Sequence, residues 1–173
     1  LLPQSARIKA GSIRARGEDI TRCPERRMCQ LRGKLFSMVF QDPMTALNPA
    51  MTVGEQIGEA VLVHRPRLGK RALRTRVAEL MELVGIDHPE ERMGLCPYSF
   101  SGGMRQRVVM AIALAGEPAI LFADEPTTAL DVTIQAQILD LLRQVQHRLG
   151  TATVFVTHDL GLVARAADRV AVM

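Results

Sequence analysis

The sequence predicts an α/β protein with a parallel sheet core and an inserted helical subdomain. Toward the end of the chain, short apolar runs alternate with helical patterns, which is typical of a parallel sheet. Between residues 43 and 105, apolar residues recur at helical spacing and no run resembles a strand. We therefore expect three segments: residues 1–42 begin the sheet core, residues 43–105 form the helical subdomain, and residues 106–173 complete the core.

The first expected elements are short strands. Residues 8–16 alternate weakly, with turns at Gly11 and Gly17, which predicts a strand or a small hairpin. Residues 35–40 are a short apolar run that stops at Gln41-Asp42-Pro43, and they predict a buried strand.

Three helices are expected next. Two of them have apolar residues at helical spacing, and the second stops at Gly85. The third is expected from Arg105 to Ala115, before Glu117-Pro118. The apolar positions of the first two helices are Val53, Ile57, Ala60 and Val61, then Leu73, Val77, Leu80, Met81 and Val84.

The last part of the chain alternates strands and helices. Residues 119–123 are entirely apolar and predict a strand buried on both faces. An amphipathic helix is expected up to Leu149, with Gly150 as its stop. A second buried strand is expected over residues 153–156, a short helix over residues 160–167, and a final strand over residues 169–173.

Composition favours one soluble domain. The 173 residues are 47% hydrophobic, and the apolar runs are shorter than the ~18 to 20 residues of a membrane-spanning helix. The three cysteines match no metal or redox spacing, so we expect reduced and mostly buried thiols. Residues 1–36 carry nine bases and three acids, and a second basic cluster spans Arg65 to Arg76. That cluster suits nucleic acid, an anionic membrane, or simply a solvated helix face.

Polar residues follow three of the predicted strands. Gln41, the pair Asp124 and Glu125, and His158 come where the strands end, and ligands bind at this edge of an open parallel sheet. Asp124 suits Mg²⁺, with Gln41 as a second ligand or as a group that positions water. Glu125 suits a general base for water attacking a phosphoryl group, and His158 suits a hydrogen-bond donor to the developing phosphate charge.

A hydroxyl and two glycines open the third predicted helix. Ser101, Gly102 and Gly103 expose backbone N–H groups at the positive end of the helix dipole, where an anion such as phosphate binds. The same residues also suit an ordinary N-cap and loop, so the pattern on its own leaves both interpretations open.

Five ordered motifs resemble those of the ATP-binding subunits of ABC transporters. Residues 101–106 resemble the signature motif, residues 120–126 the Walker B strand, residues 129–131 the D-loop, Gln41 the Q-loop glutamine and His158 the switch histidine. The stretches 40–49 and 127–137 resemble, more narrowly, the dipeptide, oligopeptide and nickel import group.

The resemblance implies an incomplete P-loop NTPase-like fold and an ATP-hydrolysing subunit that uses ATP and Mg²⁺. It implies a dimer in which Ser101, Gly102 and Gly103 contact the partner's nucleotide and Asp131 bridges the interface. It also implies membrane permease subunits, an extracytoplasmic solute-binding protein as an indirect partner, and a peripheral location on the cytoplasmic face of the bacterial inner membrane. No nucleic-acid partner is expected.

The chain departs from the family in one main respect. The phosphate-binding pattern G-x-x-x-x-G-K-[ST] does not occur in the 173 residues, so we expect a truncated chain that is inactive by itself. Phe100 stands where the family's signature usually has Leu. Two other functions stay open: an ABC-type ATPase acting on nucleic acid or ribosomes, and a non-catalytic regulatory module. The transported solute is not encoded in these motifs.

Overall fold

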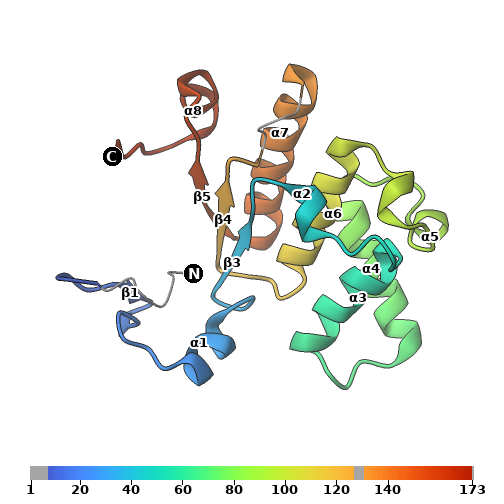
Figure 1. Cartoon of the computed structure of the whole chain (residues 1–173), viewed down its shortest axis with the longest axis horizontal. Helices are drawn as coiled ribbons and strands as arrows, with labels where there is room; N and C mark the ends of the chain where they lie inside the picture. The colour runs from blue at the N-terminus through green and yellow to red at the C-terminus, as the bar shows by residue number, and fades with distance from the viewer. Residues whose placement is uncertain (1–7, 127–130, 173) are drawn as a thin grey trace. The chain divides into compact units, whose positions relative to one another are not determined.

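The computed structural model describes residues 8–126 and 131–172. The chain divides into two compact units, Leu1–Arg32 and Gly33–Met173. The second unit holds the main sheet and the elements α2 to α8 (Figure 1). The finer division at residues 42/43 and 105/106 stays a prediction.

The first unit contains a small hairpin, but it lies over residues 14–19, and residues 8–13 of the predicted segment 8–16 are in no strand. Strands β1 (Arg14–Ala15) and β2 (Glu18–Asp19) pair antiparallel. The two residues between them, Arg16 and Gly17, have φ values of 49° and 84°. Two successive left-handed residues are the geometry of the hairpin turn that matches the twist of its strands, so Gly17 is needed for the turn itself.

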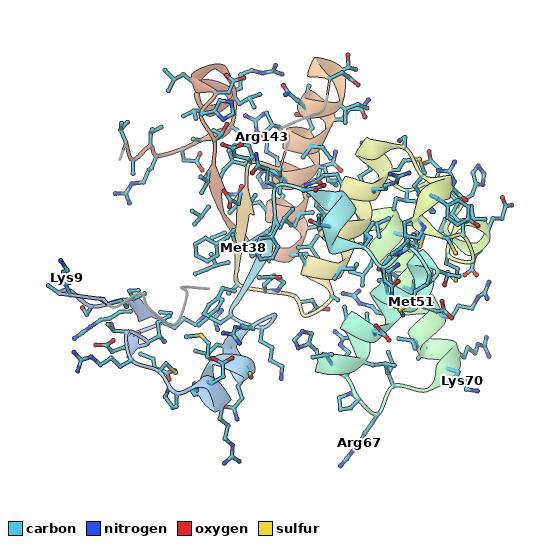
Figure 2. All side chains as sticks on the ribbon, in the orientation of Figure 1. Lys9, Met38, Met51, Arg67, Lys70 and Arg143 are labelled. Carbon is cyan, nitrogen blue, oxygen red and sulfur yellow. The ribbon has the colours of Figure 1, made fainter. Side chains whose placement is uncertain are left out.

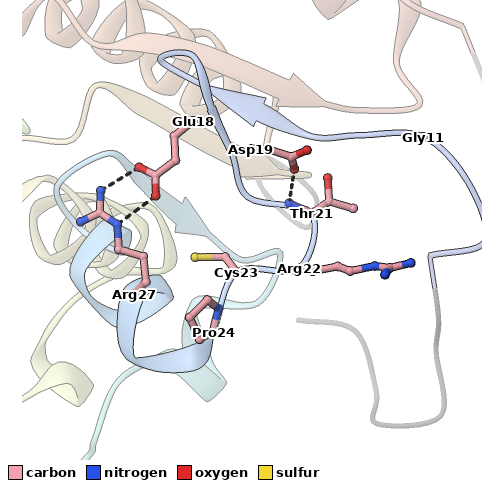
Figure 3. A pocket seen from close by; sticks show the side chains of 8 residues that line it. All are labelled: Gly11, Glu18, Asp19, Thr21, Arg22, Cys23, Pro24 and Arg27. Carbon is pink, nitrogen blue, oxygen red and sulfur yellow. Dashed lines mark hydrogen bonds and ion pairs between the residues drawn. The ribbon is translucent and has the colours of Figure 1, made fainter.

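Helix α1 (Glu25–Leu31) follows the hairpin. The guanidinium of Arg27 donates to both carboxylate oxygens of Glu18, at 3.0 and 2.7 Å, and so joins the helix to the hairpin (Figure 3). The three cysteines form no disulfide, but they are less buried than predicted. Cys29 is exposed, and Cys23 and Cys96 are half-buried.

Three parallel strands form the main sheet in the order β3-β4-β5. They are β3 (Phe36–Val39), β4 (Ile120–Asp124) and β5 (Ala152–Val156). In the register, Val39 pairs with Ala123, and Ala123 pairs with Phe155. The carboxyl ends of all three strands therefore meet at one edge of the sheet.

The two faces of this sheet differ in burial. Val39 and Leu121 lie in the core together with residues of α6 and α7. On the alternate positions, Phe122 is 36%, Val154 44% and Val156 45% exposed. The prediction that β4 and β5 are buried was therefore wrong for one face of the sheet. Apolar composition does not specify whether a second layer of structure covers that face.

Helices dominate residues 43–105, as predicted, and they pack around Ile57, Leu80 and Met81, each 0% exposed. Thr52 and Glu55 form a reciprocal capping box that starts α3. The elements are α2 (Pro43–Ala46), α3 (Val53–His64), α4 (Lys70–Leu83), α5 (Pro89–Arg92), a 3₁₀ turn (Pro97–Ser99) and α6 (Gly102–Leu114). Helix α6 begins three residues before the predicted start because Ser101 caps it.

The end of the chain contains α7 (Val132–Leu149) and α8 (Leu160–Ala166). Gly150, with φ of 65°, ends α7 as predicted. The strand predicted over 169–173 was wrong for Arg169–Val172, which lie in no strand, and Met173 is outside the described residues. An alternating apolar pattern makes a strand only where a neighbouring strand pairs with it. No helix within the described ranges is long and apolar enough to cross a membrane.

Candidate active site

Three polar side chains meet at the carboxyl edge of the sheet. Gln41 follows β3, Glu125 follows β4 and His158 follows β5. Gln41 Nε2 donates to Glu125 Oε2 at 2.8 Å, and His158 Nδ1 lies 2.9 Å from Glu125 Oε1. The partners are 84 and 33 residues apart in the chain. Parallel pairing thus gathers three of the residues singled out in the sequence around one carboxylate.

The backbone holds Glu125 in an unusual conformation. Its φ is 44°, in the left-handed region that residues with a Cβ rarely adopt. Its N–H donates to Val156 O at 2.9 Å, so the residue is still anchored to β5 when the chain turns away from the strand. Such strain persists where the surroundings impose it, and here it aims the carboxylate at Gln41 and His158.

The Glu125 carboxylate raises the pKa of the His158 imidazole. The hydrogen bond to Glu125 and then its negative charge raise the pKa of His158, and the Asp159 charge adds a smaller contribution. A carboxylate only accepts hydrogen bonds, so Nδ1 carries a proton in this pairing. The raised pKa favours the imidazolium, in which Nε2 also carries a proton that can be donated to an anion. The side chain is 75% exposed, so an anion can reach it.

Asp124 ends β4, immediately before Glu125, and pairs with Val156 in the sheet register. It is half-buried. Within the described residues, no group of three or more His, Cys, Asp or Glu side chains could hold a metal ion. The two donors expected to hold a metal here, the Asp124 carboxylate and the amide oxygen of Gln41, are fewer than a complete cage requires. Such a set fits Mg²⁺, which keeps several waters and binds substrate phosphates as well.

The remaining predicted site residues start two helices. Ser101 is the N-cap of α6, and its Oγ accepts from Met104 N at 3.4 Å. Ser101 and Gly102 are exposed, whereas Gly103 is buried. Asp131 caps α7, accepting from Ile134 N at 3.0 Å. The other residues of the D-loop resemblance, 129 and 130, lie outside the described part of the chain.

Sequence reasoning missed Gln56, which shapes the loop after Gln41. Its buried side chain accepts from Asn48 N at 2.9 Å and donates to Asn48 O and Met51 O at 2.9 and 3.1 Å. The signal was present in the sequence, because a glutamine sits beside Val53 and Ile57 on the apolar face of the predicted helix. A polar residue there needs buried partners.

Three of the six bases in the second basic cluster pair with acids from elsewhere in the chain. Arg65 and Arg76 both bind Glu117 Oε1, at 2.7 and 2.8 Å, and Arg74 binds Glu90. Figure 2 shows Arg67 and Lys70 extending from the turn between α3 and α4. Three of the cluster's bases thus hold the helices in place, which weakens the nucleic-acid alternative.

Curated relatives match the whole chain closely. It is 54% identical over 173 residues to the dipeptide transport ATP-binding protein DppD of Bacillus subtilis, covering 100% of this chain and 51% of that protein. It is 56% identical over 166 residues to the oligopeptide transport ATP-binding protein OppD of the same organism, covering 96% and 46%. The chain thus spans about half the length of these curated relatives.

Solved structures confirm the expected α/β cassette fold. CbiO1 of Clostridium perfringens, part of the ABC transporter complex cbiONQ, matches with a TM-score of 0.81 and 28% identity over 92% of this chain and 61% of that chain. The ATP-binding cassette MJ0796, solved as a dimer bound to ADP and Pi, matches with a TM-score of 0.76 and 26% identity over 91% of this chain and 66% of that chain.

The family model described as "ABC transporter" matches residues 1–128, well over half of the sequence. That match covers the strand leading to Gln41, the segment from Ser101 to Gly103, and the strand end at Asp124 and Glu125. Together with the curated relatives, it establishes that the chain belongs to the ABC transporter family.

Proposed function

We propose that this chain is part of an ATP-hydrolysing subunit that powers peptide import through a membrane transporter. The observation that carries the proposal is the Glu125 carboxylate, held between Gln41 and His158 at the carboxyl edge of the sheet. Nothing in the described residues favours the nucleic-acid or regulatory alternatives over this function.

Glu125 acts as the general base for hydrolysis. A water attacks the γ-phosphorus of ATP, the bond from that phosphorus to the β–γ bridging oxygen breaks, and ADP and phosphate form. The Glu125 carboxylate accepts the proton that the water loses. Gln41 restricts this carboxylate through its 2.8 Å hydrogen bond, so the base is oriented before substrate arrives.

His158 stabilises the phosphate charge that develops during attack. Glu125 holds the Nδ1 side of the ring, which leaves the Nε2 side to face the substrate. The raised pKa increases the fraction of imidazolium, whose Nε2–H is the donor that a phosphoryl oxygen needs.

Asp124 and the Gln41 amide oxygen would hold Mg²⁺ together with ATP and water. The ion supplies positive charge to the phosphates when it is bound. Asp124, at the end of a paired strand, offers a carboxylate fixed by the sheet register. Two protein donors are enough because nucleotide and water complete the coordination.

The subunit works as a dimer at the cytoplasmic face of the membrane. Ser101, Gly102 and Gly103 bind the nucleotide of the partner cassette, and Asp131 reaches across the interface. The helical segment 43–105 docks on the permease subunits, and a solute-binding protein delivers the cargo to them. The solved dimer of the similar cassette MJ0796 supports this assembly, and the relatives named for dipeptide and oligopeptide transport support peptide as cargo.

The test is Glu125→Gln in the intact protein that carries this chain. Glutamine keeps the shape but cannot accept the proton, so steady-state ATP hydrolysis falls by about a hundredfold or more while binding of a fluorescent ATP analogue persists. Asp140→Asn, on the exposed face of α7 and outside the segment 43–105, is the matched control and keeps full activity. Unchanged hydrolysis in Glu125→Gln refutes the base assignment.

Peptide import is tested separately, in cells that lack this subunit. Uptake of a labelled dipeptide and of a labelled longer peptide is expected to return with the wild-type gene and with Asp140→Asn, and not with Glu125→Gln. If ATP is hydrolysed but no peptide uptake returns, the cargo assignment is wrong and the ATPase assignment stands.

A further inference from the structure

The start of α6 lies close to the first turn of α7, where Gly103 faces Ile134. Gly103 is the second residue of α6 and is buried. A Cβ placed on Gly103 would lie 2.8 Å from Cγ2 of Ile134 and 3.7 Å from its Cδ1. Real Cβ atoms essentially never approach another heavy atom to 2.8 Å. A glycine is therefore required here for packing within the chain, apart from any requirement set by a ligand.

Ile134 is also the residue that Asp131 holds. The Asp131 carboxylate accepts the backbone N–H of Ile134 at 3.0 Å and so caps α7. One residue thus presents its side chain to Gly103 and its amide to Asp131. The two segments expected to act on the partner cassette are connected through Ile134 within one chain.

A second connection lies one turn further along both helices. Arg107 Nη2 donates to Gln137 Oε1 at 3.1 Å, and Arg107 Nη1 donates to Val84 O at 2.8 Å. Arg107 follows Gly103 by one turn of α6, as Gln137 follows Ile134 on α7. Two successive ties between the helices resist both sliding and rotation of α6 against α7.

We propose that Ile134 is a positioning residue: seated on Gly103, it sets the separation between the Ser101–Gly103 segment and Asp131, so that both move as one unit against the partner's nucleotide. This inference rests on the proposed function of those segments. Two separate contacts then require glycine at position 103: the approach of a nucleotide and the approach of Ile134. Mutagenesis can separate these two requirements.

The displacement that a methyl group at position 103 would cause follows from these distances. Ordinary contact begins at 3.4 Å, so moving a Cβ at 103 and Cγ2 of Ile134 from 2.8 Å to that distance separates them by about 0.6 Å. Misplacing groups at a reacting centre by this order of distance lowers the turnover number by about tenfold to a hundredfold. ATP binding to the subunit's own phosphate site is not affected by this change.

The experiment is a set of double variants in the intact protein. Gly103→Ala is expected to lower kcat for ATP hydrolysis by about tenfold or more, with the affinity for a fluorescent ATP analogue unchanged. Adding Ile134→Ala removes Cγ2 and restores most of kcat. Adding Ile134→Val, which keeps Cγ2, restores none. The Ala and Val variants differ by two methyl groups, one of which is the Cγ2 that makes the close contact, so they are matched controls.

A glycine elsewhere tests whether the rescue is specific. Gly54→Ala places a Cβ 2.7 Å from Met93 O, and Ile134→Ala does not repair that variant. Thermal unfolding of each variant is recorded as well, because rescue of Tm without rescue of kcat means that the contact only packs the helices and overturns the positioning role. Failure of Ile134→Ala to restore kcat also overturns it. Absence of hydrolysis by the wild-type protein instead refutes the proposed function, and the positioning role with it.

Discussion

Replacing Gln56 with alanine tests how the loop after Gln41 keeps its shape. The Gln56 side chain is 8% exposed and makes three hydrogen bonds to the backbone of Asn48 and Met51. Alanine removes all three, leaves Asn48 N–H and Met51 O to find other partners, and leaves Asn48 O with only its 3.4 Å bond from Met51 N. We expect the 46–52 loop to loosen while α3 itself stays folded, because α3 retains its Thr52–Glu55 capping box.

The size of the effect follows from these three bonds. Each group left without a partner costs about 1 to 3 kcal/mol, and the low end applies because the bonds are only partly buried. The loop is therefore destabilised by about 2 to 3 kcal/mol. An opening equilibrium shifted by that amount exposes the Asn48 amide to exchange roughly 30-fold to 150-fold more often.

The assay is hydrogen exchange of the intact protein, followed at the amide of Asn48. Glu59→Ala, on the same helix but exposed, is the control and leaves the exchange of Asn48 unchanged. If Asn48 exchanges at the wild-type rate in Gln56→Ala, then Gln56 does not hold the loop. If exchange instead rises throughout α3, the variant has unfolded the helix and the local reasoning is wrong.

Two further predictions concern charge and packing. Because the folded-state pKa of His158 is raised above 6.5, its pairing with Glu125 contributes stability that is complete below pH 6.5 and is lost as the pH rises through the raised pKa. In an NMR titration of the His158 ring, we expect the titration midpoint to fall toward 6.5 in Glu125→Gln. A wild-type midpoint at or below 6.5 contradicts the pairing. Ile138→Ala on α7, where the side chain is 0% exposed, is expected to lower the free energy of unfolding by about 3 kcal/mol. Its control, Leu160→Ala at a position 76% exposed, changes that free energy by less than about 0.5 kcal/mol in urea titrations, and equal losses refute the assignment of Ile138 to the core.

The sequence predicted the polar residues at the strand ends of the candidate site, but not the residues that support them. Gln41, Glu125 and His158 each follow an apolar run, and the rule that parallel strands end at one edge predicts that they meet. Gln56 and Ile134 were not identified, since a single polar residue on an apolar face, or an isoleucine in an amphipathic pattern, does not specify its partner.

The fold, too, has features that the local sequence pattern predicts and features that it does not. The periodicity of Val53, Ile57 and Val61 predicts α3 because neighbouring residues of a helix are close in sequence, and that information is local. The pattern at residues 169–173 predicts a strand, yet Arg169–Val172 lie in none, because a strand depends on a neighbour that local pattern does not provide.

The sequence by itself determined where the longer helices lie, where the strands of the sheet end, and which polar groups stand at those ends, but it did not predict the short helices α1, α2 and α5. The tertiary structure decided that Glu125 takes both Gln41 and His158 as partners, that one face of the sheet leaves Phe122 and Val154 exposed, and that Gly103 receives Ile134. The physical reason is the separation along the chain between the residues that interact. Helical and strand periodicities arise between residues a few positions apart, whereas these contacts join residues tens of positions apart and exist only once the elements have packed.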